Sequence, residues 1–186
     1  MLYQIISLLL DVAVGLVAGA CLLRLYMQYQ KIPMSARSGN PIGNFVFTLT
    51  DWIVLPLRRF VPSVGRWDTA SLLSTYLLEL LQFLILWAIS GAGAGLAQIP
   101  VLAVFGVARL VLSAMTGLMI FYAVLSWVQS HSPLTDIIER LAAPPLRPIR
   151  RRVPLVGGID LSPLVLLVLL QVAAIVLGAL QAALIL

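Results

Sequence analysis

The stretch PLRRFVPSVGRWDTASLL, residues 56–73, returns as PIRRRVPLVGGIDLSPLV, residues 148–165. At an offset of 92 the two segments align without a gap, and both carry proline, two arginines, a second proline, glycine and aspartate in that order. A long internal repeat indicates a duplicated structural unit. The sequence therefore predicts two similar halves, residues 1–95 and 96–186.

Each half contains two long apolar stretches joined by an arginine-rich connection. A transmembrane helix needs about 20 predominantly apolar residues, and four stretches are long enough: residues 2–29, 69–90, 101–127 and 162–186. Upstream of the connections the offset becomes 98, so that residues 25–29 align with residues 123–127. Two spans return the chain to the side from which it started. The repeats should therefore be parallel and related by a pseudo-twofold axis along the membrane normal.

The composition supports a membrane protein. Of 186 residues, 61% are hydrophobic and 10% charged, whereas about a quarter are charged in soluble domains. The single cysteine, Cys21, and the single histidine, His131, exclude an intrachain disulfide and any cluster of such metal ligands. We therefore expect an all-α membrane protein: four transmembrane helices in two parallel tandem repeats, without a metal or cofactor.

The basic residues indicate the orientation in the membrane. Lysine and arginine accumulate in cytoplasmic loops, and the whole net charge of +5 lies in the two long connections. The segment 91–99 and both chain ends carry no charged side chain. We therefore expect both termini outside and both long loops in the cytoplasm.

Each long connection also contains an amphipathic segment of about ten residues, 45–53 in the first and 134–141 in the second. Asn-Pro at 40–41 and Ser-Pro at 132–133 are typical of helix starts. Segments this short should form cytoplasmic helices in the plane of the membrane interface. A re-entrant hairpin is the competing interpretation.

An arginine-proline segment follows each amphipathic segment, residues 56–62 and 147–154. Because proline removes a backbone donor and fixes φ, we expect two extended straps, which present Arg58, Arg59, Arg147, Arg150, Arg151 and Arg152. These arginines could set the topology and attract anionic lipids, or bind an acidic partner protein. Asp68 and Asp160 then precede the second span of each half, where they are expected to cap that helix; ion pairs with the nearby arginines are the alternative.

These features resemble the tandem motifs of the YggT family, called YlmG in plastids and cyanobacteria. The resemblance rests on LLRLYMQ at 22–28, Asn-Pro at 40–41 and the two arginine-proline-glycine-aspartate segments. It implies an integral inner-membrane or thylakoid protein connected with cell-division gene clusters, nucleoid distribution, cytochrome cofactor assembly or osmotic stress. One position departs from the family pattern: Arg24 has Tyr122 as its counterpart, where the motif usually has a second arginine.

Four charged residues fall within the spans, where each is a functional candidate by default. Asp11 and Arg109 are equivalent at the offset of 98, and we expect them to pair between the halves, as a structural lock or a proton or cation relay. Arg24 and Glu79 form a weaker candidate pair. Snorkelling of Arg24 to the headgroups is the alternative.

Small residues predict the faces on which helices pack. Helix-packing patterns occur at Gly15 and Gly19, at Ser113 and Gly117, and along Ala174, Gly178 and Ala182. Close contact within one chain is the favoured explanation, and a homo-oligomer is the alternative.

The sequence contains no catalytic constellation, and none is known for the family, so no enzyme activity is expected. We expect a non-enzymatic membrane scaffold or assembly factor linked to cell division or membrane-complex assembly. Its partners would be anionic lipids and a protein of unknown identity, without sequence-specific nucleic acid binding. An oligomeric ion channel or transporter for osmotic protection is the alternative.

Overall fold

The structure, a computed structural model, describes residues 1–34, 40–63, 65–91, 95–128, 132–153 and 160–185. Every regular element within these ranges is a helix. In chain order the elements are α1 (Leu2–Tyr29), α2 (Pro41–Phe60), α3 (Thr69–Ile89), the short 3-10 helix η2 (Leu96–Gln98), α4 (Ile99–Val128), α5 (Pro133–Arg150) and α6 (Ser162–Ile185).

Four of these helices, α1, α3, α4 and α6, are long and apolar enough to cross a membrane. They coincide closely with the four predicted spans. Their exposed side chains are largely apolar, because lipid rather than water surrounds such helices and a helix satisfies its own backbone groups there. The prediction of an all-α membrane protein with four spans is confirmed.

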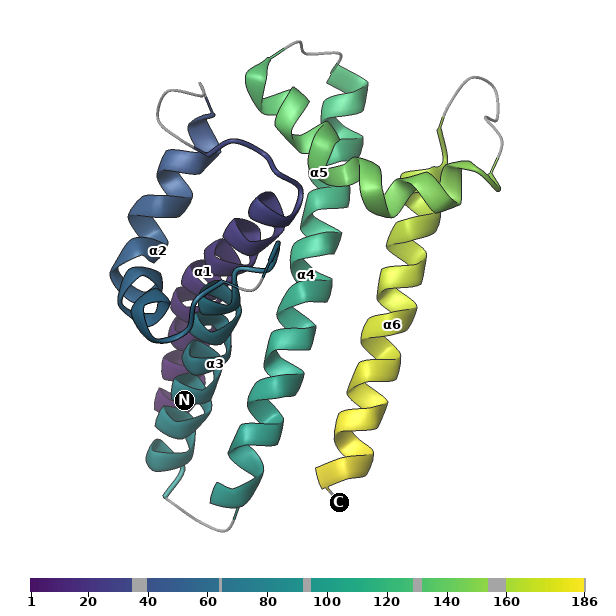
Figure 1. Cartoon of the computed structure of the whole chain (residues 1–186). Coiled ribbons are helices and arrows are strands. Elements are labelled where there is room, and N and C mark those ends of the chain that lie inside the picture. Colours follow the sequence, from purple (N-terminus) through teal and green to yellow (C-terminus); the bar gives the residue numbers. More distant parts are fainter. Residues whose placement is uncertain (35–39, 64, 92–94, 129–131, 154–159, 186) are drawn as a thin grey trace.

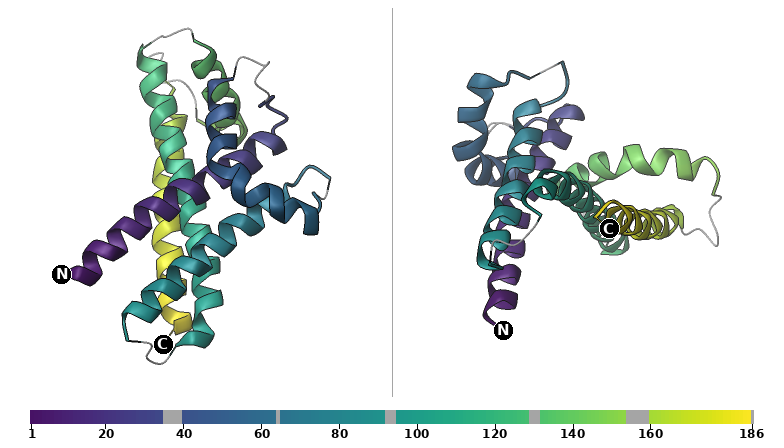
Figure 2. Two further views of the ribbon diagram at one scale, coloured as in Figure 1. Left: turned by 90° about the vertical axis from the view of Figure 1, so that its left-hand side faces the viewer. Right: turned by 90° about the horizontal axis from the view of Figure 1, so that it is seen from below.

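The helices form two similar groups (Figure 1). Helix α1 packs against α2 and α3, and α4 packs in the same way against α5 and α6. Contacts between the groups are less symmetric: α3 packs on α4, whereas its counterpart α6 makes no comparable contact with α1 among the described residues. Figure 2 shows the α1–α3 pair inclined to the α4–α6 pair. The repeat is therefore clear within each half, but a closed twofold arrangement is not formed.

Helices α2 and α5 begin where the sequence predicts. The Asn40 side chain accepts hydrogen bonds from the Ile42 and Gly43 amides, and the Ser132 hydroxyl accepts one from the Thr135 amide. Each helix buries one face at equivalent positions: Val46, Thr50 and Val54 in α2, and Ile138, Ala142 and Leu146 in α5. Through these faces α2 packs on α1 and α3, and α5 packs on α4 and α6; Figure 1 shows both helices toward the same end of the bundle.

The expectation of extended straps is wrong. Helix α2 continues through Pro56 to Phe60, and α5 continues through Pro144, Pro145 and Pro148 to Arg150. Proline inside a helix removes one hydrogen bond and bends the chain, but its φ remains compatible with helix. Figure 1 shows α5 bent along its length. The two helices have 20 and 18 residues, about twice the predicted length.

One carbonyl freed by these prolines has a partner on another helix. Pro145 cannot donate to the Leu141 carbonyl four residues earlier. Instead the Tyr26 hydroxyl of α1 donates to the Leu141 oxygen at 2.8 Å. A proline in α5 thereby creates an acceptor through which the two halves are joined.

The glycine patterns do not mark close helix contacts. A β-carbon added at Gly15, Gly19, Gly117 or Gly178 would meet no atom within 4 Å. The first three line an apolar groove that the amphipathic helices α2 and α5 flank. The close approach occurs instead at Gly106, where a β-carbon would overlap the carboxylate of Glu79.

Candidate functional site

An arginine and an aspartate close the same turn in both halves. Arg58 Nη2 lies 2.5 Å from Asp68 Oδ2, and Arg150 Nε lies 2.7 Å from Asp160 Oδ2. We call these pairs the first and the second latch. Each arginine lies in the last turn of its amphipathic helix, α2 or α5, and each aspartate just before the next transmembrane helix. These places suit a cation and an anion respectively, because a helix is negative at its C-terminus and positive at its N-terminus.

In the first half the latch belongs to a cluster that also contains Arg24 and Asp51. We call it the buried cluster because Arg24 and Asp68 at its centre are buried, whereas Arg58 and Asp51 at its edge are partly exposed. The Arg24 side chain of α1 is 3% exposed. Its Nη1 donates to Thr50 Oγ1 at 2.8 Å and to Asp51 Oδ1 at 2.6 Å, and its Nε lies 3.8 Å from Asp68 Oδ2. The guanidinium also lies 4.8 Å from the centre of the Phe47 ring. Arg24 thus joins α1 to α2 and to the start of α3.

Asp68 is the centre of this buried cluster. Its side chain is fully buried, and Oδ2 accepts hydrogen bonds from Arg58 and from the Ser71 hydroxyl at 2.7 Å. Asp68 occupies the N-cap position of α3, but its side chain accepts no bond from a backbone amide there. The prediction that the Asp68 carboxylate caps the backbone amides of α3 is therefore wrong. The carboxylate interacts with Arg24, Arg58 and the Ser71 hydroxyl instead.

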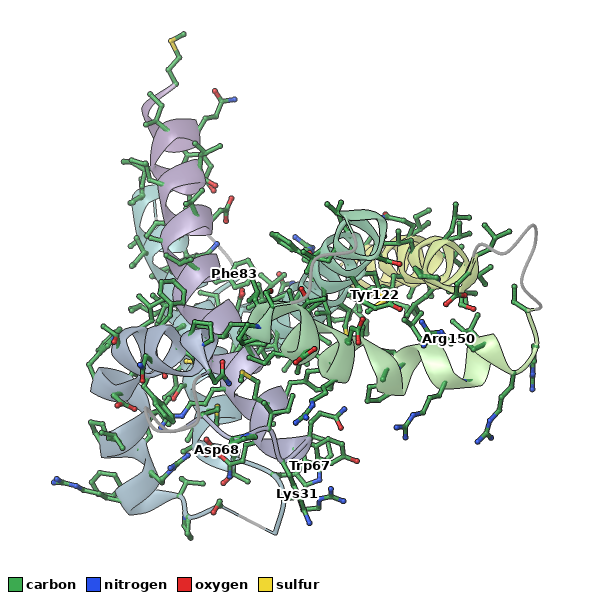
Figure 3. The ribbon with its side chains drawn as sticks, turned by 90° about the horizontal axis from the view of Figure 1, so that it is seen from above. Lys31, Trp67, Asp68, Phe83, Tyr122 and Arg150 are labelled. Atoms are coloured by element: carbon green, nitrogen blue, oxygen red, sulfur yellow. The ribbon has the colours of Figure 1, made fainter. Side chains whose placement is uncertain are left out.

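In the second half the corresponding group is smaller and more exposed. Tyr122 replaces Arg24, and Arg150 Nη2 donates to its hydroxyl at 2.5 Å. The Arg150 and Asp160 side chains are 41% and 29% exposed. Asp160 also accepts a hydrogen bond from the Ser162 amide at 2.9 Å, so it combines the predicted cap with the alternative ion pair. Figure 3 shows Tyr122 and Arg150 facing one another, well separated from Asp68.

The second latch changes the acidity of both partners. Burial by itself raises the pKa of Asp160, but the hydrogen bonds from Ser162 and Arg150 outweigh it and hold that pKa below its ordinary value. Burial by itself lowers the pKa of Arg150. The interactions with Asp160 and Tyr122 raise it by more, so the pKa of Arg150 lies above its ordinary value. Both groups are therefore charged at neutral pH.

The other arginines of the predicted straps take no part in the latches. Arg59, Arg147, Arg151 and Arg152 are exposed, and they form no ion pair with any residue that the structure describes. Four cations are thus held at the ends of α2 and α5 and are free to bind a ligand.

The predicted ion pair between Asp11 and Arg109 is not formed. Asp11 Oδ1 accepts a hydrogen bond from Gln82 Nε2 at 2.5 Å, and Arg109 Nη2 donates to Gln181 Oε1 at 2.6 Å. Each membrane charge is therefore bound by an amide within its own half. Equal depth did not bring the charges together because α3 packs on both α1 and α4.

The predicted pair of Arg24 and Glu79 is not formed either. Arg24 points toward Thr50 and Asp51 at the end of the bundle. Glu79 is 7% exposed and packs against Gly106 of α4, where it interacts electrostatically with Arg109 and Asp11. It has no hydrogen bond to a described residue.

Sequence reasoning missed Thr50, Asp51 and Ser71 as members of the buried cluster. Asp51 counted only as a loop charge, and the two hydroxyl residues carried no signal. Among the described residues, His, Cys, Asp and Glu do not gather in groups of three that could hold a metal ion; His131 lies outside the described residues.

Each half of the chain has two transmembrane helices and one latch between them, and this repeated arrangement can be compared with known proteins. The family model described as CCB3/YggT matches residues 3–89 and 101–181, one segment in each half. The chain belongs to the CCB3/YggT family. Both latches and every member of the buried cluster lie inside the segments that match YggT.

The relatives cover most of this YggT chain. Protein YggT of Escherichia coli K12 is 36% identical over 173 residues, which cover 90% of this chain and 86% of that protein. A Vibrio alginolyticus protein described as lying in the proC 3′ region is 35% identical over 177 residues, 94% of this chain and 91% of its own. A Haemophilus influenzae protein is 32% identical over 170 residues, 88% and 86% of the two chains. No solved structure matches this YggT chain.

Proposed function

We propose that this protein is a non-enzymatic membrane scaffold or assembly factor that binds an acidic cytoplasmic protein. The binding residues would be Arg59, Arg147, Arg151 and Arg152, which we call the outward arginines. The observation that carries the proposal is that some arginines form ion pairs within the protein and others are exposed. Arg58 and Arg150 each bind an aspartate of their own half, whereas Arg59, Arg147, Arg151 and Arg152 are exposed and make no ion pair with a residue in the described ranges. The latches hold two short helices in place, and the free cations lie at the ends of those helices.

This arrangement suits recognition of an acidic surface more than catalysis. Arginine offers five donors in a planar fork that matches carboxylates, so four arginines on fixed helices favour a defined acidic patch. The proposal places α2 and α5 on the cytoplasmic side of the inner membrane, in accord with the positive-inside rule. Assembly of a membrane complex or of the division machinery is the role to which such a surface would contribute.

The experiment separates the two classes of arginine. One variant changes Arg59, Arg147, Arg151 and Arg152 to glutamine, and the matched variant changes Arg58 and Arg150 to glutamine. We expect the first to insert and unfold like the wild type but to lose most photo-crosslinking from a probe at the neighbouring exposed position Phe60. The Arg58 and Arg150 variant should instead unfold at a lower temperature than the wild type, because it lacks both latches.

The partner then supplies its own control. Neutralising the acidic residues of the crosslinked segment should abolish capture, and restoring them should recover it. If capture depends instead on the content of anionic lipid in the vesicles and no acidic protein segment is found, the arginines bind lipid and the scaffold proposal fails.

The orientation needs a separate test. Single cysteines at Arg151 and at Ser90, introduced in a Cys21→Ala background, should react with an impermeant thiol reagent only from the cytoplasmic and only from the outer side, respectively. The opposite labelling would reverse the proposed topology and remove the arginines from the cytoplasm.

A second candidate, an oligomeric channel or transporter, is favoured by Glu79 alone. Its carboxylate is buried in the middle of α3 without a hydrogen bond to a described residue, and such groups often mark ion pathways. Purified protein in potassium-loaded liposomes should then show flux that Glu79→Gln reduces. Absence of flux at every voltage and osmolarity would exclude this candidate.

A further inference from the structure

An apolar groove lies where the two halves meet, between α1, α3 and α4. It has a volume of about 430 Å³. Its walls include Leu22 and Tyr26 of α1, Leu72 of α3, and Val111, Met115 and Leu118 of α4. These residues belong to transmembrane helices, and Leu72 and Val111 among them are exposed. The groove is therefore open on the surface that the bilayer would cover, where a lipid chain is the neighbouring molecule.

Aromatic rings form one end of this groove. Tyr29 and Trp67 both line it, and their ring centres lie 4.9 Å apart. Tyrosine and tryptophan are enriched at the depth of the lipid headgroups. The groove therefore ends at the level where an acyl chain joins its glycerol and phosphate.

Two unpaired cations lie at the same end. The Arg66 guanidinium lies 5.3 Å from the centre of the Tyr29 ring and donates to the Tyr29 carbonyl at 3.4 Å. Lys31 follows Tyr29 by two residues, just after the end of α1, and Figure 3 shows it on the same side of the molecule as Trp67. Both cations are exposed, and the structure gives neither an ion pair with any residue that it describes.

The backbone at Lys31 supports a role for its side chain. Lys31 has a φ of +56°, in the left-handed region, at the end of α1. Helices usually place glycine at this position, because a β-carbon is disfavoured there. The chain has a lysine instead, and it is the only lysine in the sequence. The next residue, Ile32, is buried and packs against Met27, which holds the turn in place.

From these observations we propose that the groove binds one acyl chain of an anionic phospholipid, whose phosphate pairs with Arg66 and Lys31. Charge complementarity favours an anionic over a zwitterionic headgroup. The second half lacks the equivalent residues, since Arg66 and Trp67 correspond to Gly158 and Ile159 at the offset of 92. Each chain therefore has one such site, which is distinct from the outward arginines and does not depend on the proposed scaffold function.

Fluorescence quenching of Trp67 tests the proposal. Replacing Trp52, Trp87 and Trp127 with phenylalanine leaves Trp67 as the only tryptophan. The protein is reconstituted in phosphatidylcholine vesicles that contain a small fraction of brominated phosphatidylglycerol or brominated phosphatidylcholine. We expect the phosphatidylglycerol to quench Trp67 at a several-fold lower mole fraction.

Three variants make the test decisive. Arg66→Gln with Lys31→Gln should abolish the preference and leave quenching by phosphatidylcholine unchanged. Arg59→Gln with Arg151→Gln, which removes the same charge elsewhere, should retain the preference. Val111→Phe, which fills the groove without changing a charge, should reduce quenching by both lipids.

Equal quenching by the two lipids in the parent protein would overturn the proposal, as would a preference that survives loss of both cations. A preference lost in the Arg59 and Arg151 variant would show instead a general attraction of anionic lipid to the basic surface. Because quenching is read from inserted protein in vesicles, a variant that fails to fold is recognised by its lack of insertion, and Lys31→Gln alone then provides the milder test.

Discussion

The first half buries the aspartate of its latch, whereas the second half keeps the equivalent aspartate partly exposed, although the two latch arginines are similarly exposed. The difference follows from one position in the first helix of each half, Arg24 in the first and Tyr122 in the second. Arg24 brings a second cation, which is buried, and the partly exposed Asp51 supplies a second carboxylate for it. Tyr122 brings no charge, and the counterpart of Asp51 is Ala143 at the offset of 92. Both groups are therefore neutral overall, which shows that the two differences compensate one another.

The largest effect should come from Asp68→Asn. It leaves Arg24 and Arg58 facing a neutral amide in a buried cluster, and breaking a buried ion pair on one side costs about 3–5 kcal/mol. The matched variant Asp160→Asn breaks an exposed pair, for which about 0–1 kcal/mol is typical. Denaturant unfolding in mild detergent measures both. Equal losses would show that burial does not distinguish the two latches.

A double-mutant cycle tests the compensation. Arg24→Tyr and Asp51→Ala each remove one member of the buried cluster, and together they give the first half the residues of the second. We expect the double variant to be more stable than the sum of the single losses by about 0.5–3 kcal/mol, because the partners are in contact.

Arg24→Tyr combined with the distant Asp160→Asn provides the control for that cycle. Their losses should add within about 0.5 kcal/mol. Additivity in both cycles would mean that Arg24 and Asp51 do not depend on one another.

Gly106 tests the asymmetry between the halves. It lies where α4 meets α3, and its counterpart at the offset of 98 is Leu8, which is 63% exposed. Gly106→Ala would force the added methyl group against Glu79, and overpacking of this kind costs about 1–3 kcal/mol. Gly15→Ala and Gly117→Ala, which point into open space, should lie within about 0.5 kcal/mol of wild type in the same thermal unfolding measurement.

The smallest effect concerns pH at the second latch. The pKa of Asp160 lies below its ordinary value of 3.8 in the folded protein, so the unfolded chain binds a proton more readily. The stabilisation is therefore complete above the pKa of the unfolded chain and is lost as the pH falls through the lower pKa of the folded state. Unfolding between neutral pH and about pH 3 should show a slightly weaker acid dependence in Asp160→Asn, and salt should reduce the difference. An unchanged profile would exclude a contribution from this carboxylate.

Much of the fold could be predicted because its signals are local. The spans follow from the lengths of the apolar stretches, and the starts of α2 and α5 follow from Asn40-Pro41 and Ser132-Pro133. The repeat also implied that Arg58 and Arg150 would occupy equivalent places. The latches confirm that equivalence, although the ion pair was only the alternative to a helix cap.

The pairing of membrane charges could not be predicted from sequence. Position along a span gives depth, but contact also requires that two side chains face one another around their helix axes. Asp11 and Arg109 share a depth, yet Gln82 and Gln181 lie closer within each half. The helical conformation of the proline segments was missed for a related reason. Helix propensity is a local property, whereas the hydrogen bond from Tyr26 to the Leu141 carbonyl joins two distant helices.

The sequence by itself determined that this is a four-span membrane protein with a duplicated arginine-aspartate motif, because hydrophobic length, charge position and internal repetition can each be read along one chain. Only the tertiary structure decided which latch aspartate is buried, which arginines remain free and where the halves leave a groove. Those properties depend on which helix faces lie against one another, and the offset of the repeat does not contain that information.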